Sequence, residues 1–152
     1  MKGVVFDMLR DMVEEHYGLE GWQAVLEESG SDGLYLSTET YDDDELLGLV
    51  NAASVVSGVA VNDLVFAFGR FMVGEFYKRF PGYFDASPSL LDFLLSVDQV
   101  IHTEVRKLYT DAQLPEFRYD QTDAEQLVME YRSPRKLCRL AEGLIDGSAH
   151  FF

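Results

Sequence analysis

The sequence has few cysteines, few positive charges and no long apolar run. Cys138 is the single cysteine. An intrachain disulfide is therefore excluded, and we expect a cytoplasmic protein in which Cys138 is a small apolar residue of the core. Twelve Lys and Arg residues against 27 Asp and Glu residues give a formal net charge of −15. Because such a surface repels phosphate backbones and anionic lipids, neither nucleic acid nor a membrane is an expected partner.

The sequence motifs that mark common enzymes are missing too. There is no His-Glu-x-x-His zinc motif, no glycine-rich phosphate loop, no nucleophile elbow and no Cys-x-x-Cys pair. No run approaches the roughly 18 apolar residues of a membrane-spanning helix. We therefore expect a protein that is not an enzyme and that has no transmembrane segment.

The residues that are present predict an α+β fold with a mostly helical first part. Apolar residues make up 47% of the 152 residues, which is enough for one core, so residues 1–152 are expected to form a single domain. In "VVFDMLRDMVEEHYG" the apolar residues recur at the spacing of one helical face, and Gly18 is the expected end of that helix. Helical patterns of this kind continue to about residue 110.

From about residue 111 to residue 152 the pattern changes. "LPEFRYD" and "EQLVMEYRS" predict two strands of a small antiparallel sheet, joined by the polar "QTDA". The helix before them is expected to begin at Ser87, with Pro88 in its first turn, and to run to about Tyr109. A last helix is expected to begin at a Ser133 cap with Pro134 in its first turn.

His102 is the histidine with the most apolar surroundings, since Val100, Ile101 and Val105 lie beside it in the sequence. A single buried histidine is more often a core residue than a metal ligand. It cannot hold a structural zinc ion alone, because such a site needs four donors. It can hold an iron whose other ligands come from a cofactor, and haem is the main example.

Positive charge gathers in "VMEYRSPRKLC", residues 128–138, and at the next residue, Arg139. If this segment is extended, the side chains of Tyr131, Ser133 and Arg135 alternate onto one face. Hydroxyl and guanidinium donors of this kind suit the two propionate carboxylates of a haem. The alternative is a charged first turn of a helix on the protein surface.

Several segments together resemble the haem–nitric oxide/oxygen binding (H-NOX) family. They are "DQVIHTEVRKLY", "LPEF", Tyr-x-Ser-x-Arg, the opening "MKGVVFDMLRDMVEEHYG", "AFGRFM" and "AEGLIDGSAHFF". That family includes the haem domain of soluble guanylate cyclase and standalone bacterial sensors. Family members continue beyond the last helix into final strands, which are absent from this sequence of 152 residues.

The resemblance implies a haem b buried between the helical part and the strands. It implies that His102 is the proximal ligand of the iron and that Tyr131, Ser133 and Arg135 bind the propionates. Pro115 is similar to the proline that presses on the porphyrin of family members and distorts it.

The resemblance also indicates which gas the protein binds. O2 on ferrous iron develops negative charge and is held by a hydrogen-bond donor, and in O2-binding relatives a tyrosine of the last helix provides it. Leu140 occupies that position here. The positions expected around the gas are all apolar: Val5, Leu9, Met72, Val73, Phe76, Leu140 and Leu144. This distal set favours nitric oxide, with CO as a weaker ligand, and disfavours stable O2 binding.

The resulting hypothesis is a haem-based nitric oxide sensor in which binding of the gas weakens or breaks the bond between iron and His102. The expected partner is a separate histidine kinase or cyclic-di-GMP signalling enzyme. Two alternatives remain open at this stage. One is a haem-free helical module for protein interaction, and the other is a haem domain that senses O2 or redox state.

Overall fold

The computed structural model describes all residues 1–152 and has the predicted α+β architecture, with one small antiparallel sheet. Its elements, in chain order, are α1 (Gly3–Ser29), α2 (Asp43–Ser57), α3 (Val61–Arg79), α4 (Pro81–Asp85), α5 (Leu90–Ser96), a π-helix η1 (Val97–Ile101), α6 (His102–Leu108), β1 (Glu116–Asp123), β2 (Gln126–Arg132) and α7 (Cys138–Phe151).

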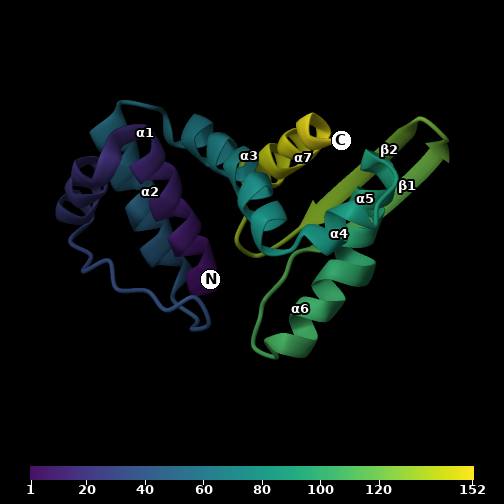
Figure 1. Cartoon of the computed structure of the whole chain (residues 1–152), viewed down its shortest axis with the longest axis horizontal. Coiled ribbons are helices and arrows are strands. Elements are labelled where there is room, and N and C mark those ends of the chain that lie inside the picture. The colour runs from purple at the N-terminus through teal and green to yellow at the C-terminus, as the bar shows by residue number, and fades with distance from the viewer.

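Figure 1 shows two arms joined along one side of the molecule. Helices α1 and α2 form one arm, and α5, α6 and the β1–β2 hairpin form the other. Helix α3 packs along α7, and the two helices join the arms. The chain begins in the first arm, at the foot of α1.

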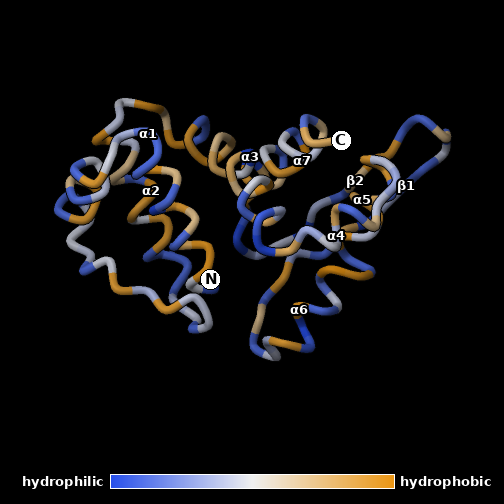
Figure 2. The backbone as a smooth tube through the Cα atoms, viewed as in Figure 1, coloured by the Kyte–Doolittle hydropathy of each residue, from blue (hydrophilic) through white to orange (hydrophobic).

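Two apolar clusters form the core. The larger contains seventeen buried residues of α1, α2 and α3, and the smaller contains Val73, Phe84, Phe93 and Leu94. Phe76 and Leu144 pack against both clusters, so the core is continuous between the arms. In Figure 2 apolar colours recur along α1 and α2, whereas the outer part of the hairpin is mostly hydrophilic.

The first helix has a break where the sequence predicts an end. Gly18 lies within α1 but has φ 70° and ψ −178°, which is far from helical geometry. A positive φ of this kind suits glycine, because it has no Cβ to clash with the backbone. The helix predicted to end at Gly18 is therefore the first half of α1, which continues to Ser29 beyond a break at that glycine.

Helices α3 and α7 approach each other very closely through two glycines. A Cβ atom added to Gly69 would overlap the backbone oxygen of Leu140, and one added to Gly143 would overlap the backbone oxygen of Phe66. Small residues at a crossing let two helix backbones touch. This contact fixes how the last helix lies against the helical body.

Three local predictions are wrong. The helix after Ser87 begins at Leu90, and its cap is Ser89, whose hydroxyl accepts a hydrogen bond from the Asp92 amide. The last helix begins at Cys138 rather than at Ser133, because a turn follows strand β2 first. Cys138 is exposed and is not a core residue, since it begins α7 ahead of Leu140 and Gly143, where the backbones of α7 and α3 meet.

No single helix combines the length and the hydropathy that crossing a membrane requires. Helices α2 and α3 reach that composition only as a pair, and they meet at an angle of 109°. Their most buried side chains belong to the larger core cluster.

Candidate functional site

His102 begins α6, directly after the π-helix, and its side chain is 13% exposed. Its Nδ1 lies 3.2 Å from Oδ1 of Asp98, and no protein group bonds its Nε2. Burial lowers the pKa of His102, and the Asp98 carboxylate opposes that effect in part. The imidazole is therefore neutral near pH 7, which is the form that binds a metal.

The hairpin places aromatic rings beside His102. The ring of Phe117 in β1 stacks on the imidazole at 5.9 Å between centroids, with 25° between the planes. Tyr131 in β2 is the cross-strand partner of Phe117, and their rings lie 5.8 Å apart. A line of rings therefore leads from His102 to the start of the Tyr-x-Ser-x-Arg segment.

Phe117 was missed as a site residue at the level of sequence, although a signal was present. It lies in "LPEF", two residues after Pro115, and residues two apart in a strand share a face. The structure shows this alternation, because Pro115, Phe117 and Tyr119 are half-buried and the residues between them are exposed.

The Tyr-x-Ser-x-Arg segment has the predicted alternation but not the predicted helix. Tyr131, Ser133 and Arg135 are half-buried, whereas Arg132 and Pro134 are exposed. The expectation that a helix begins at Ser133 is wrong, because α7 begins at Cys138. The chain forms a turn there instead, in which the Ser133 hydroxyl accepts a hydrogen bond of 3.2 Å from the Arg135 amide.

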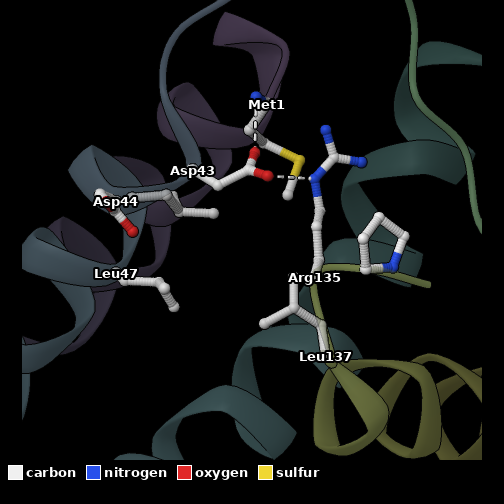
Figure 3. A pocket seen from close by; sticks show the side chains of 8 residues that line it. Met1, Asp43, Asp44, Leu47, Arg135 and Leu137 are labelled. Carbon is white, nitrogen blue, oxygen red and sulfur yellow. Dashed lines mark hydrogen bonds and ion pairs between the residues drawn. The ribbon is translucent and has the colours of Figure 1, made fainter.

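Arg135 connects the two arms. Its side chain is 13% exposed, and its Nε donates to Oδ2 of Asp43, at the start of α2, over 2.7 Å. Its Nη1 donates to the backbone oxygen of Gln113, and its Nη2 has no protein partner. The N-terminal ammonium of Met1 donates to the other Asp43 oxygen over 2.8 Å (Figure 3).

This charged cluster surrounds a cavity of about 230 Å³ that Leu46, Pro134 and Leu137 help to line. Partial burial alone would raise the pKa of Asp43, but hydrogen bonds from the ammonium of Met1 and from Arg135 outweigh it and hold the pKa below its ordinary value. Asp43 therefore stays ionised at neutral pH between two cationic groups.

The expected distal set comes together where α1, α3 and α7 meet. Val5, Leu9 and Met72 belong to the larger core cluster, and Phe76, Leu140 and Leu144 pack against it. Val73 belongs to the smaller cluster, to which Phe76 and Leu144 also contribute. All seven of these side chains are apolar.

A second polar contact joins the arms at the loop after α6. Lys2 lies 2.9 Å from Oδ1 of Asp111, and the Thr40 hydroxyl donates to Oδ2 of Asp111 over 2.6 Å. The Lys2 ammonium also lies over the ring of Tyr109, 4.8 Å from its centroid. These contacts hold the first residues of the chain against the end of the His102 helix.

The donor chemistry fits a haem better than a bare ion. No group of three or more His, Cys, Asp or Glu side chains is placed to bind a metal, so an iron at His102 needs a cofactor for its remaining ligands. Nε2 of His102 has no protein partner, the ring of Phe117 stacks on the imidazole, and Nη2 of Arg135 is free for a propionate.

A larger apolar cavity, of about 530 Å³, lies between α1, α2 and α3. Its lining includes Met12, Tyr17, Leu64 and Phe71 but none of the candidate site residues. It is therefore separate from the surroundings of His102.

Comparisons with known proteins agree with this geometry. The sequence profile of the Haem-NO-binding family matches residues 2–152. The chain therefore belongs to the haem-NO-binding, or H-NOX, family, whose members are haem-based gas-sensing domains related to soluble guanylate cyclase. The resemblance seen in the sequence is confirmed.

Among curated proteins, the chain is similar to soluble guanylate cyclase gcy-35 of Caenorhabditis elegans. The two are 28% identical over 156 residues, which cover 95% of this chain and 22% of the cyclase. Soluble guanylate cyclase 89Db of Drosophila melanogaster is 27% identical over 140 residues and is covered to 20%. The chain thus spans about a fifth of the length of these curated relatives.

Solved H-NOX structures match the whole chain. The H-NOX protein of S. oneidensis in the Fe(II)NO ligation state has a TM-score of 0.91 and 33% identity, and 85% of it is covered. The unliganded Fe(II) H-NOX protein of K. algicida has a TM-score of 0.89 and 31% identity, with 83% covered. The IWP-051-bound H-NOX of Shewanella woodyi, in the Fe(II)CO ligation state, has a TM-score of 0.88 and 38% identity, with 81% covered.

Proposed function

We propose that this protein is a haem b sensor of nitric oxide, and that it acts as a sensor rather than as an enzyme. The observation that carries the proposal is the state of His102, which is largely buried and neutral and keeps Nε2 free beside an aromatic face. A ferrous haem in this place supplies an iron with a position open to a diatomic gas.

His102 provides the protein ligand to the iron in this proposal. Tyr131, Ser133 and Arg135 provide the hydroxyl and guanidinium groups for the propionates, at the inner end of the hairpin. Pro115 lies half-buried just before β1 and shares a face with Phe117, which supports contact with the flat surface of the cofactor.

The choice of gas follows from the distal set. A donor to bound O2 is worth about 1.5–3 kcal/mol, and none of the seven distal side chains carries one. Nitric oxide binds ferrous iron tightly without that help, and CO binds more weakly. The H-NOX of S. oneidensis, solved in the Fe(II)NO ligation state, supports the same assignment.

With haem bound, release of His102 from the iron would provide the signal. Helix α6 is then free to move with η1 and the hairpin, while α1 and α2 keep their place in the larger core cluster. The contacts between the arms, at Arg135 with Asp43 and at Lys2 with Asp111, change with that movement. We infer that a separate histidine kinase or cyclic-di-GMP enzyme responds to the rearranged surface.

The test is the absorption spectrum of the purified ferrous protein under argon, nitric oxide, CO and air. We expect stoichiometric haem, a five-coordinate species under argon, changes with nitric oxide and CO, and no lasting oxy spectrum in air. A colourless protein that takes up no added haemin contradicts the proposal and favours the haem-free interaction module.

A stable oxy spectrum in air, in contrast, would keep the haem and contradict the choice of gas. The protein would then be the O2-sensing alternative. The same four spectra therefore separate all three hypotheses.

A further inference from the structure

A short π-helix precedes His102. Residues Val97–Ile101 connect α5 to α6, and the His102 amide donates to the backbone oxygen of Val97, five residues back. Such segments are rare and are often found at functional sites. Asp98 and His102 are four residues apart, a spacing that places two side chains on the same face of a helix, so the side chain of Asp98 faces that of His102.

Asp98 holds the imidazole by its Nδ1. The distance from Oδ1 of Asp98 to Nδ1 of His102 is 3.2 Å, and the two side chains are 29% and 13% exposed. A carboxylate only accepts hydrogen bonds, so Nδ1 carries the proton and Nε2 keeps its lone pair. The carboxylate therefore determines which nitrogen can bind a metal.

A cation shares the same carboxylate oxygen. Nη2 of Arg106 lies 3.5 Å from Oδ1 of Asp98, and the Thr103 hydroxyl donates to the Asp98 backbone oxygen over 3.4 Å. Because Arg106 and His102 share this oxygen, Arg106 weakens the hydrogen bond between the imidazole and Asp98. The electrostatic effect of Asp98 on His102 is therefore reduced by the positive charge of Arg106.

We propose that Asp98 is a positioning residue that fixes the Nδ1–H form of His102 and strengthens its bond to the haem iron, with Arg106 limiting that effect. A carboxylate that accepts from the second nitrogen of a ligating histidine makes the first a stronger donor. The pair thereby sets how readily nitric oxide releases His102. This inference rests on the proposed function.

The experiment measures the iron–histidine stretching frequency by resonance Raman spectroscopy on the ferrous protein under argon. We expect Asp98→Asn to lower the frequency, because a neutral amide is a weaker acceptor. We expect Arg106→Ala to raise it, because the carboxylate is then left to His102 alone. A purely structural role for Asp98 does not produce opposite shifts in these two variants.

Glu104→Gln is the matched control. It removes one negative charge two residues from His102, but Glu104 pairs with Lys107 over 2.7 Å and has no contact with the imidazole. We expect the wild-type frequency in this variant. A second readout, transfer of haem to apomyoglobin, is expected to be faster from Asp98→Asn and unchanged in Glu104→Gln.

Each outcome of these measurements supports or contradicts the role of Asp98. A wild-type frequency in both Asp98→Asn and Arg106→Ala, with haem bound, overturns the inference and leaves the proposed function in place. If Asp98→Asn does not keep its haem, Arg106→Ala carries the test alone, because its Asp98–His102 pair is intact. A wild-type protein without haem overturns both the inference and the proposed function.

Discussion

His102 differs from the other two histidines in its surroundings. His150 is 64% exposed near the end of the chain, and His16 is exposed and bonds the Met12 carbonyl. His102 is largely buried, has a carboxylate on one ring nitrogen and leaves the other free. A single side chain with these three properties accounts for cofactor binding by a chain that offers no metal cluster of its own.

Replacing His102 by Gly is expected to abolish haem retention, or to make it depend on added imidazole, because one protein bond anchors the iron. The measurement is the haem content of the purified variant with and without imidazole. His150→Gly is the control and is expected to keep its haem. Full haem content and an unchanged ferrous spectrum in His102→Gly would contradict the assignment.

Replacing Arg135 by Ala is expected to weaken haem binding, since a partly buried propionate and Asp43 both lose their guanidinium partner. The cost is about 1–3 kcal/mol, or roughly 5- to 150-fold in the rate of haem loss. Arg132→Ala is the control, because Arg132 is exposed and pairs with Glu130 instead. Equal rates of haem loss in the two variants would show that Arg135 does not bind the cofactor.

Replacing Leu140 by Tyr is expected to favour O2. Leu140 lies in α7 and packs against the larger core cluster, next to Leu144 one turn further on. A hydroxyl there that reaches the bound gas adds about 1.5 kcal/mol or more, which is roughly tenfold in affinity. The lifetime of the oxy spectrum in air measures the effect. An oxy spectrum that lasts equally long in the wild type would contradict the prediction.

At the scale of elements, the contact between α3 and α7 decides whether the last helix can reach the distal set. Leu140 and Leu144 lie on either side of Gly143, and the backbone at Gly143 touches the backbone at Phe66 and Gly69. Any side chain at Gly143 would push α7 away from α3. The apolar region around the gas position therefore depends on glycines that do not themselves face it.

Gly143→Ala is expected to lower the free energy of unfolding by about 1–3 kcal/mol, because the added Cβ meets backbone atoms that cannot rotate away. Gly74→Ala is the matched control on α3, since a Cβ at Gly74 meets nothing within 4 Å. That variant is expected to be as stable as the wild type, or more stable by up to about 1 kcal/mol. Chemical denaturation of both variants tests the prediction, which equal losses of stability would contradict.

At the scale of the whole molecule, two polar contacts join the arms in addition to the packing of α3 along α7. One joins Lys2 and Thr40 to Asp111, and the other joins Asp43 to Arg135. Hydrogen bonds from Thr40 and Lys2 lower the pKa of Asp111 from its ordinary 3.8 to about 2. The first contact therefore responds to acid.

Because the pKa of Asp111 is lowered by folding, its contribution to stability is complete above about pH 4 and is lost as the pH falls towards 2. We expect Asp111→Asn to reduce the slope of unfolding free energy against pH in that window. Asp120→Asn, which removes an exposed carboxylate with no ion pair, is the control and should keep the wild-type slope. An identical slope in Asp111→Asn would mean that Asp111 does not couple folding to pH.

Much of this protein follows from sequence alone, because the signals are local. The spacing of apolar residues gives the helices, and the glycine at position 18 gives the break in α1. The hairpin is also where it is predicted, but its turn is Ala124–Glu125, because Gln121–Asp123 of the predicted "QTDA" connection continue strand β1. The alternation of Tyr131, Ser133 and Arg135 needs no knowledge of what they face. The spacing between His102 and this segment was specific enough to identify the family, which the comparisons confirm.

Other features were decided only by the tertiary structure, because they depend on contacts between residues far apart in the chain. The start of α7 at Cys138 depends on a turn that Arg135 stabilises through Asp43 and Gln113, 92 and 22 residues away. The place of Phe117 on the imidazole depends on how the hairpin packs against α6. The π-turn before His102 also depends on tertiary packing, which overrides the regular α-helix that local propensity favours.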